Sequence, residues 1–298
     1  MMPKMLALCV ALLLAVLAVS SNECEPVIRP PAPTPAPLPP GIKSPPHIVS
    51  LLIDDLGFDD LRSHGLKPGS PSFSPTVASL LKDGVLLNRH HTYMWCSPSR
   101  RSFITGRYIV HITGQQAGTD TNLTPLQFTI LSEKLAAANY ENHFLGKGHM
   151  GWQTTDHLLV NRGFKSHMGF LGGMESYKFG RTDDLENPAP LVGEHDCWHD
   201  DHPGTDIAPL IGYSTSFYAT QAVKRIEHRN TSMNFWLHVA FQAAHAGPHR
   251  GATDAADLLP PNPTGGTSAA KNGFRDQRYG SALHSLDHAL ANITAALK

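Results

Sequence analysis

The chain has 298 residues, with 24 Lys and Arg against 25 Asp and Glu and a formal net charge of −1. This near-neutral charge excludes a nucleic-acid-binding protein that relies on neutralising phosphates. An apolar fraction of 41% with only 16% charged residues excludes a disordered chain, which needs the opposite balance. The length allows one large core, so we expect one large domain.

The chain opens with the pattern of an exported protein. Lys4 precedes an unbroken apolar run from Met5 to Val19, which is followed by small residues. We assign residues 1–21 to a signal peptide, because the run is shorter than the about 20 apolar residues of a transmembrane helix. No later stretch predicts a stable membrane span. We therefore expect the mature protein in the secretory pathway, and finally outside the cell or in the lysosome.

A proline-rich linker separates the signal peptide from the folded part. Residues 22–46 include the sequence PPAPTPAPLPP, which favours an extended polyproline II spacer. The folded domain is therefore expected to cover residues 47–298.

The cysteines and the glycosylation sequons fit an exported chain. Three cysteines remain after the signal peptide, and an odd number indicates a reactive or modified thiol. The asparagines of the three Asn-X-Ser/Thr sequons are candidate glycan acceptors, namely Asn122, Asn230 and Asn292.

Beyond the linker, apolar runs of strand length alternate with segments of helix length. In chain order we predict a strand over 47–53, a helix running into a strand over 77–87, a helix over 126–139, a strand over 140–145, a helix over 213–229, a strand over 235–241 and a helix over 283–297. This alternation predicts an α/β fold with a layered, mixed or mostly parallel sheet flanked by helices. Reactive groups in such sheets gather beyond the carboxyl ends of the strands.

Two carboxylates directly follow the first predicted strand. Asp54 and Asp55 lie there, and Gly57 helps the chain to turn. Past the end of a strand both carboxylates can approach one cation, and clustered carboxylate oxygens suit hard ions such as calcium. A helix cap or a turn is the alternative, since aspartate favours both.

A longer motif is Cys96-Ser-Pro-Ser-Arg100, which is followed by Thr105-Gly-Arg107. Arg100 and Arg101 close to Cys96 favour anions and predict a lowered pKa of the thiol. The motif resembles the signature of the sulfatases, Cys-X-Pro-Ser-Arg with a downstream Thr-Gly-Arg. In that family the cysteine is oxidised during export to formylglycine, an aldehyde.

Further segments match the sulfatases in order. Gly146-Lys147-Gly148-His149 resembles the family's Gly-Lys-Trp-His, with Gly148 in place of tryptophan. Arg162-Gly-Phe164 and the strand before His245 also have counterparts, and Tyr279 to Lys298 looks similar to the arylsulfatase B group. The resemblance covers residues 47–298 and implies an alkaline phosphatase-like fold.

The resemblance implies hydrolysis of a sulfuric ester of a small molecule or glycan. It implies a bound calcium ion, and a nucleophile that the formylglycine-generating enzyme makes from Cys96. The hydrated aldehyde would attack sulfur and later expel sulfate by collapsing back to the aldehyde. By this resemblance, Asp54, Asp55 and the modified Cys96 would bind calcium. Arg100 would stabilise the hydrated aldehyde, and Lys147 would bind sulfate. His149 would remove a diol proton, and His245 would contact sulfate or protonate the leaving oxygen.

Two other functions stay open. One is hydrolysis of phosphonates or phosphate diesters with the same modified cysteine, and the other is an inactive secreted fragment that binds sulfated glycans. By the resemblance, residues 47–298 are only the N-terminal part of the domain, because a further strand ending in Asp-Asn-Gly has no counterpart before Lys298. The chain as given is therefore expected to bind calcium weakly, to hydrolyse aryl sulfates negligibly and to self-associate.

The segment from Glu194 to His202 has no counterpart in the family pattern. Its candidate ligands for a second metal are His195, Cys197, His199 and His202, but their spacing fits no standard zinc pattern. We therefore interpret the segment as a solvated loop that lies beside the site and shapes substrate choice.

Overall fold

The computed structural model describes residues 44–57, 74–87, 89–112, 123–173, 196–207, 212–245 and 277–298, with the single residues 34, 37, 40, 177 and 210. The signal peptide, most of the linker, Asn122 and His195 lie outside the described residues, so their assignments stay predictions. Within these ranges, the structure contains no helix that is long and apolar enough to cross a membrane.

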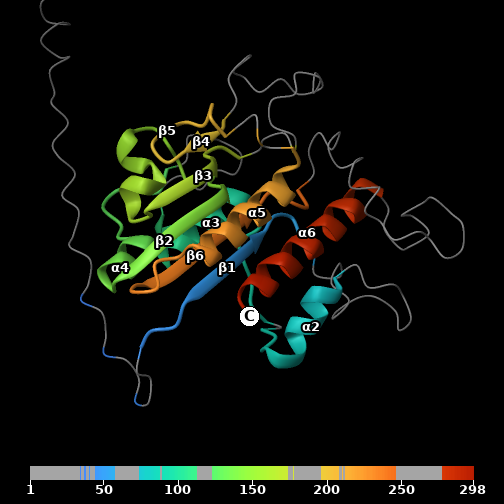
Figure 1. Cartoon of the computed structure of the whole chain (residues 1–298). Helices are drawn as coiled ribbons and strands as arrows, with labels where there is room; N and C mark the ends of the chain where they lie inside the picture. The colour runs from blue at the N-terminus through green and yellow to red at the C-terminus, as the bar shows by residue number, and fades with distance from the viewer. Residues whose placement is uncertain are drawn as a thin grey trace, which may run out of the picture.

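A six-stranded sheet carries the fold (Figure 1). Its strands are β1 (Ile48–Ile53), β2 (Tyr140–Lys147), β3 (Ser166–Phe170), β4 (Trp198–His199), β5 (His202–Pro203) and β6 (Asn234–Phe241). Their order across the sheet is β1-β6-β2-β3-β4-β5. The strands β1, β6, β2 and β3 run parallel, whereas β4 and β5 continue the sheet as an antiparallel hairpin. The parallel strands therefore bring their carboxyl ends to the same edge of the sheet.

Helices cover both faces of the sheet (Figure 1). They are α2 (Pro75–Asp83), α3 (Cys96–Thr105), α4 (Leu131–Ala137), α5 (Ser214–Glu227) and α6 (Gln277–Ala296), with short 3-10 helices η3 (Ile109–His111), η4 (Thr155–His157) and η5 (Leu159–Arg162). One face packs against α5 and α6, and α2 lies beside α6. The other face packs against α3 and α4.

The strand β6 shows how the sequence produces this layering. Phe235, Leu237 and Phe241 pack in the core beneath α5 and α6. Trp236 and Ala240 alternate with them and pack beneath α3 and α4. Because successive side chains of a strand point to opposite faces, an unbroken apolar run is the pattern of a strand that is buried on both sides.

Most predicted elements form near their predicted bounds. The strands β1, β2 and β6 and the helices α5 and α6 confirm the predicted α/β fold. The predicted strand at the end of 77–87 is wrong, because α2 ends at Asp83 and Val85 is 85% exposed on an irregular segment. The pattern predicts neither α3 nor β3, because both carry many polar residues or glycines among the apolar ones.

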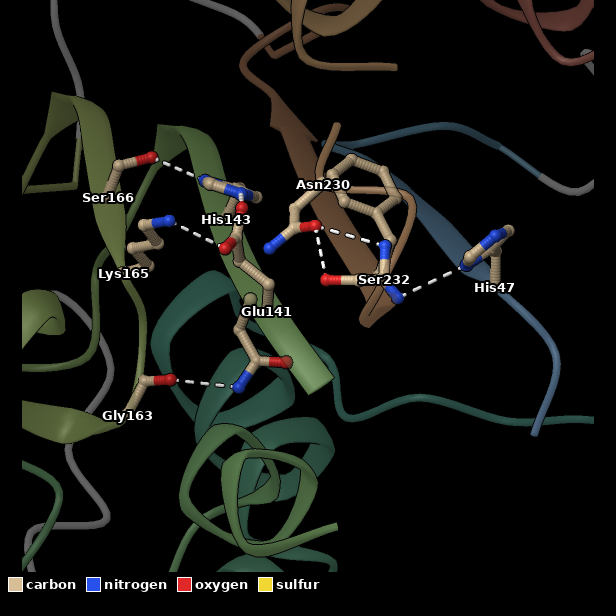
Figure 2. Close-up of polar contacts among 10 residues, drawn as sticks. His47, Glu141, His143, Gly163, Lys165, Ser166, Asn230 and Ser232 are labelled. Carbon is tan, nitrogen blue, oxygen red and sulfur yellow. Dashed lines mark hydrogen bonds and ion pairs between the residues drawn. The ribbon is translucent and has the colours of Figure 1, made fainter. Parts of the chain in front are cut away.

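A chain of polar contacts links the amino-terminal parts of β2 and β3 (Figure 2). His143 Nδ1 lies 2.7 Å from Ser166 Oγ, and His143 Nε2 lies 3.1 Å from Glu141 Oε1. Lys165 donates to the other Glu141 oxygen at 2.6 Å. His143 and Ser166 are register partners, and Ser166 is only 6% exposed, so this serine–histidine–glutamate chain supports the register of the two strands.

The two described sequon asparagines are exposed. Asn230 Oδ1 accepts hydrogen bonds from the backbone N–H and the hydroxyl of Ser232 at 3.0 and 2.7 Å (Figure 2). Asn292 lies on the exposed face of α6. Both positions are accessible to a glycosylating enzyme, and their glycosylation stays a prediction.

His238 couples the stability of the fold to pH. It lies on β6, with its ring stacked on Phe103 of α3 and 5.0 Å from that of Phe144, and its Nδ1 lies 2.8 Å from Ser50 Oγ. Burial, with a smaller contribution from Arg100, lowers the pKa of His238 to about 3. The pKa in the unfolded chain is about 6.5. Between these values only the unfolded chain binds the proton, so stability falls as the pH drops below the unfolded pKa.

We expect His238→Gln to flatten the pH dependence of the free energy of unfolding. Below about pH 5.5 the slope should decrease by about 1.4 kcal/mol per pH unit, the contribution of one titrating group. Urea unfolding at several pH values between about 7 and 5 measures this slope. His228→Gln, which changes an exposed histidine, is the control. An unchanged slope in His238→Gln would show that His238 takes up no proton on unfolding.

Candidate active site

The predicted site residues meet at the carboxyl ends of three parallel strands. Asp54 directly follows β1, Lys147 ends β2, and His245 follows β6 after a short turn. The helix α3 begins with Cys96 at the same place. A carboxylate oxygen of Asp54, the sulfur of Cys96 and a ring nitrogen of His245 lie within 4.8 Å of one another.

Asp54 is 5% exposed and has two cationic partners. Arg100 Nη2 lies 3.1 Å from its Oδ1 atom, and Lys147 Nζ donates to its Oδ2 atom at 2.5 Å. Burial by itself would raise the pKa of the Asp54 carboxyl, but Arg100 and Lys147 outweigh burial and hold the pKa below its usual value. Arg100 and Lys147 are also buried. The group thus holds two cations against one carboxylate, which suits an anionic ligand.

The Cys96 thiol lies beside this buried ionic group. Its sulfur lies within 4.8 Å of a carboxylate oxygen of Asp54, to which Lys147 donates, and the Lys147 charge favours the thiolate. Burial nevertheless raises the pKa of the thiol, and the nearby cations do not offset it. The predicted lowering of this pKa is therefore wrong, because Asp54 already balances part of the positive charge and the thiol is only partly open to water.

The backbone around the site is fixed by close approaches between strands. At Gly146 the chain has φ +98°, and a Cβ atom there would collide with the carbonyl oxygen of Ala240 on β6. Glycine therefore allows β2 to run close to β6 just before Lys147. The backbone N–H of Asp54 donates to Ala243 O at 3.0 Å, and that of Ala244 donates to Asp54 O at 2.7 Å. These bonds join the turns after β1 and β6.

His149 lies just past Lys147, with φ +50°. Its backbone N–H donates to the carbonyl of Leu171, which follows β3, at 2.9 Å. Burial first, then the charges of Lys147 and Arg100, lowers the pKa of the imidazole to about 3. His149 is therefore neutral near pH 7 and has the protonation state of a proton acceptor.

Asp55 and His245 lie together at the more open side of the site. His245 Nε2 is 3.7 Å from Asp55 Oδ2, and their side chains are 19% and 51% exposed. Asp55 thus faces His245, and the cluster within 4.8 Å contains Asp54 but not Asp55. The hydroxyl of Tyr177 lies 3.2 Å from the carbonyl oxygens of both Gln242 and His245, so it holds the turn that carries His245. The sequence offers no signal for this role of Tyr177.

Two motif arginines support the scaffold and lie outside the site. Arg101 is fully buried and donates to the carbonyl of Leu123 at 2.6 Å. Arg162 pairs with Glu133 of α4 at 2.8 Å and donates to Phe128 O at 2.8 Å. Both arginines anchor the segment that leads into α4, and only Arg100 of the neighbouring pair reaches Asp54.

The interpretation of residues 194–202 as a solvated loop is only partly correct for its described part. Asp201 and His202 are exposed, but β4 and β5 form a hairpin there, and Cys197 is 3% exposed in the main core. Asp196 accepts hydrogen bonds from the backbone N–H groups of Leu171 at 3.1 Å and Gly172 at 2.5 Å. Because Leu171 in turn accepts from His149, Asp196 is a positioning residue for the His149 backbone that the sequence did not indicate.

Comparisons with known proteins agree with this arrangement. A model of the family named Sulfatase matches residues 46–298. Mouse arylsulfatase J is 32% identical over 263 residues, which cover 86% of this chain and 40% of that protein. Human N-acetylgalactosamine-6-sulfatase is 26% identical over 273 residues, which cover 87% of this chain and 48% of that protein. The chain therefore spans less than half the length of these two relatives.

Solved structures share the fold. Ps i-CgsB in complex with k-i-k-neocarrahexaose superposes with a TM-score of 0.63 at 23% identity, over 85% of this chain and 55% of that one. PsFucS1 sulfatase from Pseudoalteromonas sp. has a TM-score of 0.56 at 18% identity, over 85% of this chain and 52% of that one. The predicted alkaline phosphatase-like fold is confirmed, while the likeness to arylsulfatase B in particular stays a prediction.

Proposed function

Because the chain belongs to the sulfatase family, we propose that it carries the site at which a sulfuric ester is hydrolysed. The strongest support for this proposal is the position of Cys96. It lies beside Lys147 and Asp54, in a buried group whose positive charges outnumber its negative charge. A sulfate ester is an anion, and preorganised cations facing a developing negative charge usually make the largest contribution to catalysis.

We assign Cys96 as the precursor of the nucleophile. The raised pKa keeps the thiol protonated near pH 7, and a protonated thiol is a poor nucleophile. This supports a modified form of Cys96, a formylglycine made during export, whose hydrated aldehyde would supply a hydroxyl for attack on sulfur. The modifying enzyme is then a necessary partner, and the secretory route to the lysosome or the cell exterior is the proposed localisation.

The donor set fits a divalent cation in part. Asp54 offers a carboxylate within the cluster, and Asp55 offers a second one beside it. Calcium takes about 6–8 oxygen ligands and binds sulfur poorly, so Cys96 suits calcium only after its conversion to an oxygen-bearing side chain. A bound cation would polarise the sulfate oxygens.

The remaining side chains have roles that follow from their contacts. Lys147 donates to Asp54 beside Cys96, so it can hold a sulfate oxygen as a point charge. Arg100 stabilises the negative charge that develops next to Asp54. Neutral His149 accepts a proton, and the more exposed His245 is placed to contact sulfate or to protonate the leaving oxygen.

Peptide mass and substrate choice test the proposal together. The chain should be produced through the secretory pathway with the modifying enzyme, and the Cys96 peptide should show the mass of formylglycine. Because the chain as given is expected to turn over little substrate, long incubations should compare a chromogenic aryl sulfate with a phosphate diester that has the same leaving group, and the aryl sulfate should be hydrolysed faster. The reverse preference would favour a phosphodiesterase, and an unmodified thiol with no turnover would favour a protein that only binds sulfated glycans. Screening of sulfated small molecules and glycans as substrates would identify the natural ester.

A further inference from the structure

A second cluster of potential metal ligands lies on the β4–β5 hairpin. It consists of His199, His202 and Asp206, whose ligand atoms lie within 4.8 Å of one another. His199 Nδ1 is 2.7 Å from Asp206 Oδ2, and the centroids of the two imidazole rings are 5.5 Å apart. This cluster shares no residue with the site that contains Cys96.

The hairpin holds both histidines on one side. His199 and His202 are register partners of an antiparallel pair, and such partners project to the same face of a sheet. Asp200 in the connecting turn is bound twice to His167 of β3, because its N–H donates to His167 O at 2.8 Å and its Oδ1 accepts from His167 N at 2.9 Å. The turn after β5 is closed by a bond from Gly204 N to the carbonyl of Cys197 at 2.7 Å.

We propose that His199, His202 and Asp206 bind a divalent transition-metal ion of the zinc class. Two imidazoles and one carboxylate form a common three-ligand zinc set, which leaves a fourth position for water. Zinc–ligand bonds of about 2.1 Å place neighbouring ligand atoms about 3.4 Å apart in a tetrahedron. Ligand atoms that now lie up to 4.8 Å apart must therefore approach, whereas His199 Nδ1 and Asp206 Oδ2, now 2.7 Å apart, must separate. His202 and Asp206 are 55% and 52% exposed, which leaves their side chains room to rotate.

The surroundings favour a cation of this class over calcium. Asp201 Oδ1 lies 3.1 Å from His202 Nδ1 and adds a second negative charge at the cluster. Imidazole nitrogen suits zinc, copper and nickel, whereas calcium prefers oxygen ligands throughout. The bound metal would tie β4, β5 and the following turn together at the edge of the sheet. This inference does not depend on the proposed sulfatase activity.

The test must exclude two other groups among the described residues that could bind zinc. One is the cluster with Cys96, and the other is His284 with His288 on α6, whose Nε2 atoms lie 3.2 Å apart. All variants are therefore made in a full-length parent chain that carries Cys96→Ala and His284→Ala. The parent is stripped with a chelator, and zinc chloride is titrated by isothermal calorimetry in the presence of calcium.

In this parent, His199→Ala and His202→Ala should each weaken zinc binding at one site by at least about 100-fold, since even residues that only hydrogen-bond to the ligands of a metal contribute about 10–100-fold. Asp206→Asn should weaken it less, and His228→Ala, on another exposed surface, should leave the isotherm unchanged.

A second readout follows the backbone in the same proteins. Zinc should slow hydrogen exchange of the Asp200 and Gly204 amides in the parent but not in His202→Ala. Because His202 is exposed, its replacement should not disturb the fold, so a loss of zinc-dependent protection in His202→Ala cannot be attributed to misfolding. The same isotherm in the parent and in the His199→Ala/His202→Ala double variant, or the absence of any zinc binding by the parent, overturns the proposal.

Discussion

Replacement of Cys96 with alanine is expected to reduce whatever sulfate ester hydrolysis a modified chain shows to the rate without protein, because a covalent route has no substitute for its nucleophile. Lys147 and Asp54 contact each other directly, so their ion pair should survive the change. Initial rates with an aryl sulfate, at equal concentrations of folded protein, measure the loss.

Cys197→Ala is the matched control for this experiment. It removes the other described cysteine, which is buried in the main core. We expect Cys197→Ala to lower stability somewhat and to leave turnover per folded molecule unchanged. If Cys96→Ala kept most of the activity, the assigned nucleophile would be wrong.

Asp54→Asn should destabilise the fold by about 3–5 kcal/mol, because removal of one partner from a buried ion pair leaves uncompensated charge. In this variant Arg100 and Lys147, both nearly inaccessible to water, would face each other without the carboxylate that now separates them. Urea denaturation at constant calcium measures the free energy of unfolding.

Asp55→Asn provides the comparison, since it makes the same chemical change one residue further along. Asp55 is 51% exposed, and its Oδ2 atom lies 3.7 Å from His245 Nε2. Exposed pairs contribute about 0–1 kcal/mol. Equal destabilisation by the two substitutions would contradict the view that Asp54 holds two buried cations together. Loss of calcium affinity in both would support the assignment of both carboxylates to the metal.

The sequence predicts the central layers of the fold well and its edges poorly. The strands β1 and β6 are mainly apolar, with Ser50 in β1 and His238 in β6 as inner polar residues, and such runs arise when helices cover both faces of a parallel sheet. The strand β3 has the sequence SHMGF, and its burial depends on partners far away in the chain, so local composition does not reveal it. The hairpin of β4 and β5 has two residues per strand, too few for any periodic pattern.

The sequence also indicates which residues meet, but not their electrostatics. Positions after parallel strands converge by topology, so Asp54, Lys147 and His245 could be placed at one edge of the sheet before their contacts were known. The direction of the Cys96 pKa shift depends on how deeply the thiol is buried and on which cations are already paired. Neither quantity is local to the motif, and both come only from the packed structure.

The parallel pairing of β1 with β6 joins residues 188 positions apart, as in the contact of Ser50 with His238. During synthesis, the sheet around Cys96 therefore stays unfinished until His245 has emerged. At about 5–20 residues per second this leaves roughly 7–30 seconds in which the cysteine motif is an accessible peptide. The order in which the chain emerges would therefore allow the proposed modification of Cys96 before folding closes the site. Thiol labelling of nascent chains arrested before and after residue 245 should show Cys96 reactive only in the shorter ones, and equal labelling would refute this timing.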